Sequence, residues 1–428
     1  MTDATAGNLK QEIKVVGVVS GGHFMSHCYG MILPPLFPIL HTELGVPYTA
    51  LGLLLSLKSL SFGVMQLPAG ILVDRFGARA ILVFGFAIIL GSYLVISMVE
   101  TFWLIGVLFV VAGIGDAVFH PADYSIMSGT VASSRMGRSF SAHIFAGYLG
   151  MGAAPAVVLF MIGVMGWTWR EVIQAFVVIG LVVIAGLFTQ WQHIKEAPDK
   201  PQKPSKPVAE RTGNPDPGGA GEEQTSWQAM KQIFTSVPML FLLLFFSFQA
   251  LGSGAFKNFA VAGLVSLHGT SLEAAGGALS GFLFATAAGA LGGGLLADRL
   301  GRHGTIAAVA LAVSAAIAVL VGVVDLHYTL LVFAFTMAGL LQGIIRPARD
   351  MMIRAASPKG SIGKAFGFVS SGHAIGGTVA PVLLGALLDI GLPEWLFYCS
   401  AIFLVICMLS VLGSAHWSRK ERLAAGGV

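Results

Sequence analysis

The sequence has little charge and almost no cysteine. Only 11% of its 428 residues are Asp, Glu, Lys or Arg, whereas 55% are apolar, and the mean hydropathy is +0.81. A soluble domain of this length could not tolerate so few polar side chains, so the composition indicates a membrane protein. The three cysteines, Cys28, Cys399 and Cys407, fall within apolar runs, so a disulfide framework is not expected.

The sequence also lacks the motifs of nucleotide-driven and enzymatic chemistry. No G-x-x-x-x-G-K-[S/T] loop occurs, so ATP hydrolysis is not expected to power the protein. No Ser/His/Asp, Cys/His or acid pair stands at a predicted membrane boundary. His23 and His27 alone are weak evidence for a metal site. We therefore predict that the protein is not an enzyme and that it has no cofactor and no metal.

Twelve apolar runs are long enough to cross a membrane. A spanning helix needs about 20 mostly apolar residues, and the sequence predicts an all-α membrane protein with twelve transmembrane helices. The 55 glycines indicate close helix packing in lipid. The predicted spans are residues 14–40, 49–73, 80–99, 102–130, 138–163, 171–193, 238–266, 272–297, 304–324, 328–354, 363–389 and 393–416.

The second half of the chain repeats the first. Residues 70–79, GILVDRFGAR, recur as residues 294–303, GLLADRLGRH, at an offset of 224. Residues 120–155 align with residues 346–381 at an offset of 226. Two parallel halves in one membrane protein indicate a transporter whose halves are related by a pseudo-twofold axis along the membrane normal.

The distribution of Lys and Arg predicts the orientation. With the N-terminus placed in the cytoplasm, twenty of the 25 Lys and Arg residues fall on the cytoplasmic side, four lie inside predicted spans, and one, Arg170, falls outside. This asymmetry predicts a multi-pass protein of the cell inner (plasma) membrane with both termini in the cytoplasm. The net charge of +4 is then a topology signal, and no nucleic-acid partner is expected.

A polar segment separates the two halves. Residues Lys195 to Gln224 are rich in Pro, Gly, Lys and Glu and predict a flexible linker. The following residues, Ser226 to Phe234, predict a short surface helix. The polar residues Met1 to Gln11 do not predict a cleaved signal peptide. The predicted organisation is an N-terminal tail (1–12), a six-helix bundle (13–194), a cytoplasmic linker (195–236), a second six-helix bundle (237–417) and a C-terminal tail (418–428).

The six plus six helices and the doubled motif G-x-x-x-D-R-x-G, followed by Arg, resemble the major facilitator superfamily. The resemblance implies two pseudo-symmetric six-helix bundles, alternating access and a monomer in the lipid bilayer. It also implies a gate, because an Asp at a helix end can meet the positive N-terminus of a neighbouring helix when the cytoplasmic side closes. The gating residues would be Gly70, Asp74, Arg75, Gly77, Arg79, Gly294, Asp298, Arg299, Gly301 and Arg302.

The segment GDAVFHPAD, residues 115–123, is similar to the fosmidomycin-resistance group of exporters within that superfamily. This resemblance implies efflux. Two departures weaken it: Ala122 stands where the group carries an acid, with Asp123 next, and the fourth predicted helix has no Arg of the kind that drug/proton antiporters carry. Efflux is therefore favoured, and proton-coupled uptake remains the alternative.

Ionisable residues inside the predicted spans are candidates for the transport site. Each costs at least about 2.5–3.5 kcal/mol at a helix centre, so its presence needs a reason. In the family that the chain resembles, helices 1, 4, 7 and 10 line the central cavity. Most of the ionisable residues within the predicted spans fall on these four helices. The substrate-binding candidates are His23, His27, Lys58, Lys257, Arg346 and Arg349, and the proton-coupling candidates are Asp116, His120 and Asp123.

The charge balance inside the spans favours an anionic substrate. Four cations stand against three acids, and Lys58 and Lys257 have no evident acidic partner. Asp116 with His120 is the candidate proton site, because an imidazole titrates in the physiological range. In the structural alternative, Asp116 or Asp123 forms ion pairs with Arg346 or Arg349 across the two halves, and the histidines are packing residues.

The sequence therefore predicts a secondary active transporter that moves a small organic anion or an anionic drug-like compound by alternating access. The favoured mode is proton-coupled efflux, with protons and a small-molecule substrate as partners. The alternatives are proton-coupled uptake or exchange of the anion. A transporter-like sensor that binds its ligand without moving it is a third possibility.

Overall fold

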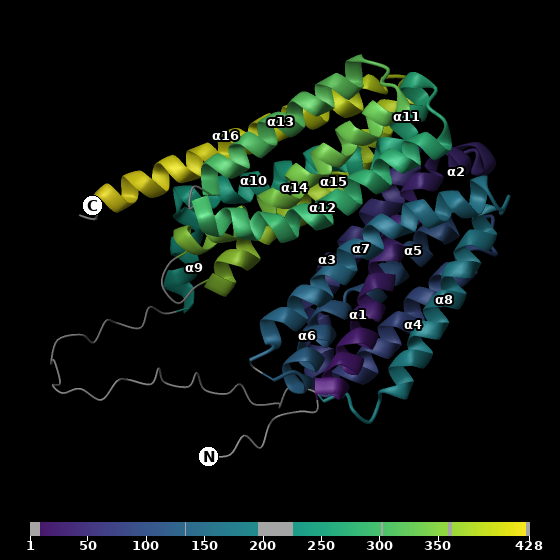
Figure 1. Ribbon diagram of the computed structural model, residues 1–428, viewed down its shortest axis with the longest axis horizontal. Helices are drawn as coiled ribbons and strands as arrows, with labels where there is room; N and C mark the ends of the chain where they lie inside the picture. The colour runs from purple at the N-terminus through teal and green to yellow at the C-terminus, as the bar shows by residue number, and fades with distance from the viewer. Residues whose placement is uncertain (1–8, 133, 196–225, 301–302, 358–361, 425–428) are drawn as a thin grey trace.

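The computed structural model describes residues 9–132, 134–195, 226–300, 303–357 and 362–424, and every regular element within these ranges is a helix (Figure 1). The first half contains α1 (Leu9–Met31), the 3₁₀ turn η1 (Pro34–Leu36), α2 (Phe37–Leu44), α3 (Tyr48–Phe76), α4 (Ala78–Ile96), α5 (Phe102–Asp116), α6 (Phe119–Thr130), α7 (Met136–Gly163) and α8 (Trp169–Thr189). The linker helix α9 (Ser226–Thr235) precedes the second half, which contains α10 (Val237–Gly254), the π-helical turn η2 (Ala255–Phe259), α11 (Ala260–His268), α12 (Leu272–Leu300), α13 (His303–Val323), α14 (Tyr328–Ala356), α15 (Ile362–Asp389) and α16 (Glu394–Ala424).

The two halves form two helical bundles. They meet at the end that carries α2 and α11 and diverge toward the end where α9 and both chain termini lie (Figure 1). Between the halves, α3 packs on α15 and α7 packs on α12. Among the described residues, eleven helices are long and apolar enough to cross a membrane. The prediction of an all-α membrane protein is thereby confirmed.

The outer faces of the bundles are apolar. Trp103, Val182 and Phe333 expose 72%, 66% and 61% of their surface, although large apolar side chains of a soluble protein are mostly buried. The bundle interiors bury aromatic side chains, such as Phe256, whose ring lies 5.4 Å from that of Phe282. The exposed apolar faces fit contact with lipid.

The first predicted span, residues 14–40, is not one continuous helix. The α-helix α1 ends at Met31 and the chain resumes as α2 after a short 3₁₀ turn. Pro34 and Pro35 cause the break, because proline has no backbone N–H to donate to the carbonyl four residues earlier. With its charged first turns and two histidines, α1 is not among the eleven helices that meet the criterion for a span.

Two other predicted spans are distorted at charged residues. Residues 102–130 form α5 and α6 with a break after Asp116, where Pro121 cannot donate to the carbonyl of Ala117. Residues 238–266 include the π-helical turn η2, which contains Lys257. Such turns are rare and are frequent at functional sites. Both irregularities therefore coincide with an ionisable residue, Asp116 in one and Lys257 in the other.

The predicted short helix before the seventh span is present. It forms α9, which packs against α10 and α15. Ile233 is buried and the ring of Phe234 lies 5.0 Å from that of Phe368. The preceding residues of the predicted linker, 196–225, lie outside the described ranges.

A carboxylate of the second half caps a helix of the first. The helix α3 begins after Pro47, whose side chain supplies no cap. Asp389, at the end of α15, accepts hydrogen bonds from the backbone N–H groups of Tyr48 (2.7 Å) and Thr49 (2.8 Å) and from the Thr49 hydroxyl. The backbones are close here, because a Cβ on Gly52 would overlap the carbonyl of Pro381. Asp389 thus ties the halves together at the end where they meet.

Replacing Asp389 by Ala is expected to loosen this end. Loss of a helix cap costs about 1 kcal/mol. This free energy changes about fivefold the ratio of molecules in which the halves are in contact at this end to molecules in which they are apart. Spin labels on cysteines introduced at Thr42 and Glu394 would report the change as a larger population of molecules with a long distance between the two labels. The exposed Asp325→Ala is the control; equal distance distributions in Asp389→Ala and wild type would contradict a capping role.

Candidate functional site

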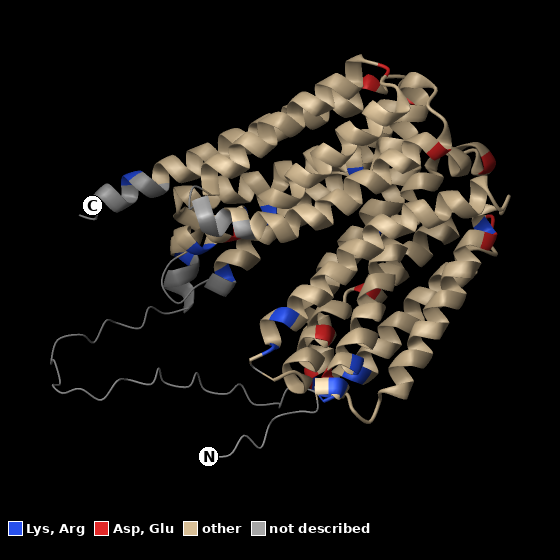
Figure 2. Ribbon diagram, viewed as in Figure 1, with Lys and Arg blue, Asp and Glu red and all other residues tan. Residues whose placement is uncertain are grey.

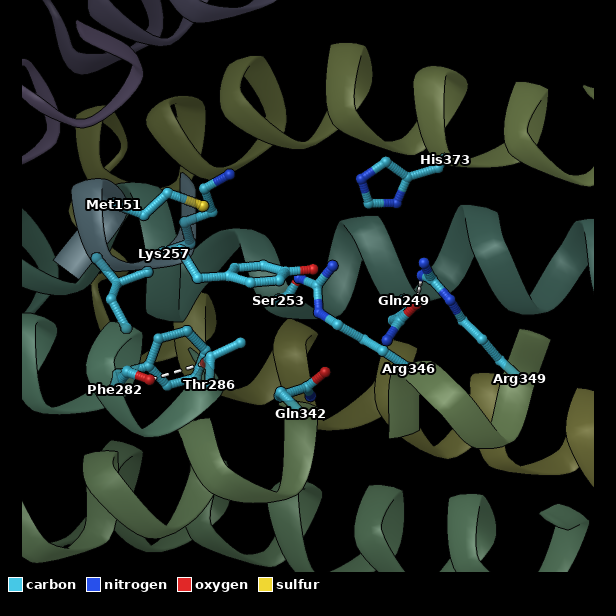
Figure 3. A pocket seen from close by; sticks show the side chains of 12 residues that line it. Met151, Gln249, Ser253, Lys257, Phe282, Thr286, Gln342, Arg346, Arg349 and His373 are labelled. Atoms are coloured by element: carbon cyan, nitrogen blue, oxygen red, sulfur yellow. Dashed lines mark hydrogen bonds between the residues drawn. The ribbon is translucent and has the colours of Figure 1, made fainter. Parts of the chain in front are cut away.

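A cavity of about 490 Å³, part of it open to solvent, lies between the two halves (Figure 3). Two of its twelve lining residues, Tyr148 and Met151, come from α7; the other ten come from α10, η2, α12, α14 and α15. The lining contains three cationic side chains and no Asp or Glu. These cations are Lys257, Arg346 and Arg349.

The two arginines lie one helical turn apart on α14 and have different partners. Arg349 donates to the side chains of Gln249 (3.2 Å) and Asp350 (3.2 Å). The guanidinium carbon of Arg346 lies 4.9 Å from the ring centre of Tyr148, a cation–π contact across the two halves. The Nε of Arg346 is buried and has no hydrogen-bond acceptor among the described residues. Arg349 is therefore neutralised locally, whereas Arg346 is not.

Lys257 projects into the cavity from η2. Within the described residues it makes no ion pair, and it lies beside Ser253 and Met151 in the lining. Figure 3 shows Lys257 and Arg349 toward opposite ends of the cavity, with Arg346 between them. An uncompensated ammonium in a partly desolvated cavity attracts an anion strongly. Among the described residues, the cavity lining is thus net positive.

A second polar cluster lies inside the first half. The Oδ2 of Asp123 is 3.3 Å from Nε2 of His143 and 3.5 Å from Nδ1 of His23, and all three residues are buried. The rings of His23 and His143 are stacked with centroids 4.2 Å apart, and the ring of His120 is 5.3 Å from that of His23. We call His23, His120, Asp123 and His143 the histidine cluster.

The histidine cluster has unsatisfied polar atoms. Neither carboxylate oxygen of Asp123 has a hydrogen-bond donor in good geometry among the described residues, and Nδ1 of His23 and Nε2 of His143 are also unpartnered. A buried carboxylate in such a place needs a bound proton, an ion or a water. Its ligand atoms lie within 4.8 Å of those of the two histidines, close enough to share a proton or to hold a metal ion.

One helix connects the histidine cluster with the cavity. A Cβ on Gly147 of α7 would lie 2.7 Å from the ring of His23, so this residue is in tight contact with the cluster. The next residue, Tyr148, contacts Arg346 in the cavity. Adjacent residues of one helix therefore contact the histidine cluster and the cavity.

Lys58 and Asp116 form an ion pair at the break between α5 and α6. The Lys58 Nζ lies 3.3 Å from Oδ2 of Asp116, and the two side chains are only 10% and 17% exposed. Ser26 of α1 donates to the other oxygen of Asp116. The prediction that Lys58 lacks an acidic partner is therefore wrong, because α3 and α5 pack together and bring the two side chains into contact.

Lys58→Met is expected to destabilise the protein because it leaves the carboxylate of Asp116 without its cation. Removal of one partner of a buried pair costs about 3 kcal/mol. The double variant Lys58→Met/Asp116→Leu is expected to recover most of this loss. Thermal unfolding in detergent measures both effects; a double variant no more stable than Lys58→Met would show that the pair is not the cause.

The ion pairs predicted between the halves are not found among the described residues. Asp116 pairs with Lys58, Asp123 lies with His23 and His143, and Arg349 pairs with Asp350. Asp123 and Arg349 are equivalent in the two repeats, but they lie in separate bundles. Each of them has its contacts within its own bundle. His27 lies against the ring of His23, and neither these two nor Lys58 lines the described cavity.

The first copy of the gating motif lies at the end of α3. Gly77 has a positive φ of 88°, which glycine tolerates and other residues rarely adopt. Asp74 and Arg75 are exposed, and Arg79 donates to the carbonyl of Trp191 (3.1 Å). In the second copy Gly294 lies in α12, but the side chains of Asp298 and Arg299, and Gly301 and Arg302 entirely, lie outside what the structure describes. Gating by the motif stays a prediction.

The sequence profile of the Major Facilitator Superfamily matches residues 19–261 and 249–424, which is nearly the whole chain. The chain belongs to the Major Facilitator Superfamily. It is therefore a multi-pass membrane transporter and not an enzyme.

Several curated members of the superfamily are similar to parts of this chain. A probable L-galactonate transporter of Escherichia coli is 30% identical over 36% of this chain and 34% of its own length. A probable sulfoacetate transporter of Cupriavidus necator is 25% identical over 52% of each chain. A drug efflux pump of Mycobacterium tuberculosis is 28% identical over 35% of this chain and 29% of its own. The matches thus span between 29% and 52% of the relatives' own length.

Solved structures share the fold over nearly their full length. A bacterial homologue of the human lysosomal transporter Spinster, in an inward-facing and occupied conformation, matches with a TM-score of 0.75 at 15% identity, covering 96% of this chain and 98% of its own. The nucleoside transporter NupG matches with a TM-score of 0.73 at 12% identity, covering 94% and 99%. At these identities the likeness establishes the fold alone.

The sequence analysis missed several polar residues of the cavity. Gln249 and Ser253 precede Lys257 at intervals of four residues, and Gln342 precedes Arg346 by four. Each set lies on one face of a helix, so this spacing could have revealed them. Tyr148 carried no such signal, because it stands alone among small residues of α7.

Proposed function

We propose that the protein is a proton-coupled secondary transporter of a small organic anion. The observation that carries this proposal is the lining of the cavity, which has three cations and no acid. Buried donors without acceptors point the same way, since Nε of Arg346 and Nε2 of Gln342 both lack one among the described residues. A carboxylate or sulfonate group would supply the missing acceptors.

Two relatives support the same class of substrate. The galactonate and sulfoacetate transporters carry, by their names, organic anions. Each is similar to this chain over only part of its length, so the substrate of this chain is a proposal. The likeness to the fosmidomycin-resistance group and to the mycobacterial efflux pump supports anionic drug-like compounds as a second candidate class.

The histidine cluster is the proposed site of proton coupling. Asp123 is buried beside His23, His120 and His143, so protons shared within this group would lower the cost of its burial. This proposal moves the proton site from Asp116 with His120 to Asp123 with His143, because Asp116 is already paired with Lys58. The adjacent residues Gly147 and Tyr148 would link its protonation to anion binding at Arg346.

The charges favour symport over antiport. A proton added to the histidine cluster increases the positive charge near the cavity and so strengthens the binding of an anion. Antiport requires the binding of proton and substrate to exclude each other, whereas a bound proton attracts an anion rather than excluding it. We therefore propose cotransport of anion and proton, the alternative to the efflux that the subgroup resemblance implies.

The distribution of charge supports the proposed orientation. Figure 2 shows Lys and Arg gathered at the end of the bundles near α9 and the termini, whereas the opposite end carries mainly Asp and Glu. By the positive-inside rule, the first end faces the cytoplasm. We propose the plasma membrane as the location and a monomer as the working unit.

Exchange of labelled substrate in proteoliposomes tests the substrate class. Vesicles loaded with one member of a panel of organic acids are expected to take up labelled organic acid against its gradient, whereas organic cations of equal size should not exchange. Exchange of cations but not anions would contradict the proposal. Binding of anions without any exchange would indicate a sensor.

A further inference from the structure

The two cations without a local counter-charge lie at separate places along the cavity. Arg349 is paired with Asp350, so Lys257 and Arg346 remain uncompensated among the described residues. Lys257 projects from η2 and Arg346 from α14, on the opposite wall (Figure 3). Each positive charge in a partly desolvated site is stabilised by its own anionic partner.

The helix that carries Lys257 sets the spacing along the cavity. Arg349 bonds to Gln249, eight residues before Lys257 on the same wall. At 1.5 Å per residue these two levels are about 12 Å apart along the axis. Figure 3 shows Arg346 between Lys257 and Arg349. The two free charges are therefore less than about 12 Å apart along this axis.

The two cationic groups differ in the geometry they offer. The Arg346 guanidinium stacks on Tyr148 and keeps a buried Nε without an acceptor, as does the neighbouring amide of Gln342. A planar fork of this kind binds both oxygens of a carboxylate, or two of a sulfonate. The Lys257 ammonium is a point charge that accepts any orientation of a second anionic group.

The wall of the cavity is partly apolar. Phe282, Leu283 and Met151 line it, together with the hydroxyl-bearing Ser253 and Thr286. The Thr286 hydroxyl donates to the carbonyl of Phe282 in its own helix. Such a wall suits a short carbon skeleton with few polar substituents.

We propose that the cavity selects dianions, with one carboxylate or sulfonate at Arg346 and a second anionic group at Lys257. This inference rests on the proposed anion-transport function and narrows its substrate class. A monoanion would leave one of the two cations without a counter-charge, so it binds more weakly at the same chain length.

A comparison of the binding of dianions and monoanions of equal chain length tests this selectivity for dianions. Purified protein in detergent is titrated with succinate and butyrate, and with glutarate and valerate, at about pH 7.5, where carboxylic acids are ionised. We expect each dianion to bind at least about tenfold more tightly than its matched monoanion. In Lys257→Gln the two members of each pair should bind within about twofold of each other, because the second anionic group has lost its partner.

The controls separate this inference from the proposed function. Lys14→Gln removes an exposed positive charge from α1, and this variant should prefer dianions over monoanions as strongly as wild type does. Equal binding of dianions and monoanions to wild type overturns the dianion inference and leaves anion transport standing. Binding of neither class overturns both. An unchanged dianion preference in a folded Lys257→Gln protein, checked by its unfolding temperature, overturns the role of Lys257.

Discussion

Arg346→Gln is expected to lower anion transport about 100-fold, because a buried anionic group that loses its charged hydrogen-bond partner costs about 3 kcal/mol. Arg346 is the central cation of the cavity, has no counter-charge among the described residues, and contacts the first half through Tyr148. Glutamine keeps a donor of similar length but removes the charge. Initial rates of labelled-anion exchange in proteoliposomes measure the loss.

Two further variants show whether charge or shape is responsible. Arg346→Lys keeps the charge without the planar fork and should lose about tenfold. Arg354→Gln removes an exposed guanidinium two turns further along α14 and should exchange at the wild-type rate. Wild-type exchange by a normally inserted Arg346→Gln protein would place the anion elsewhere.

Asp123→Asn is expected to uncouple the protein from the proton gradient. Asparagine has the same shape as aspartate but cannot take up or release a proton, so the histidine cluster loses its shared acid. Accumulation of anion driven by an inward proton gradient should fall about tenfold or more. Exchange of internal for external anion needs no net proton movement and should persist.

The comparison of driven accumulation with exchange makes this prediction specific. A variant that merely folds badly would lose both activities together. Glu100→Gln, which alters an exposed acid at the opposite end of the first half, should retain both. Full gradient-driven accumulation by Asp123→Asn would assign proton coupling to other residues and leave the histidine cluster with a structural role.

Much of the fold was predictable because lipid imposes a simple rule. A spanning segment must satisfy its backbone hydrogen bonds internally, so long apolar runs become helices. The predicted spans therefore appear close to their expected bounds, for example residues 328–354 in α14. The exceptions are local: Pro34, Pro35 and Pro121 interrupt helices that hydropathy alone presents as continuous.

The site was predictable in its residue types but not in its partners. Spacing along one helix placed Arg346 and Arg349 on one face, and both line the cavity. Which acid meets which cation depends on how neighbouring helices pack, and Lys58 meets Asp116 only because α3 and α5 are adjacent. His143 is not among the candidates from the sequence, and it lies against Asp123 through contacts that no sequence spacing reveals.

The two halves carry different residue types at equivalent positions of the repeat. Asp123 is the counterpart of Arg349, and His120 that of Arg346. One repeat therefore carries acid and imidazole where the other carries guanidinium. In the proposed function, this difference places the proton-binding group in the first half and the anion-binding group in the second.

The most direct measurement records proton and anion movement together in the same vesicles, with a pH-sensitive dye inside and labelled anion outside. The account predicts that addition of the anion acidifies the interior as the anion enters, and that both movements disappear in Arg346→Gln. Alkalinisation on entry of the anion would indicate exchange in opposite directions. Entry of the anion without proton movement would contradict proton coupling altogether.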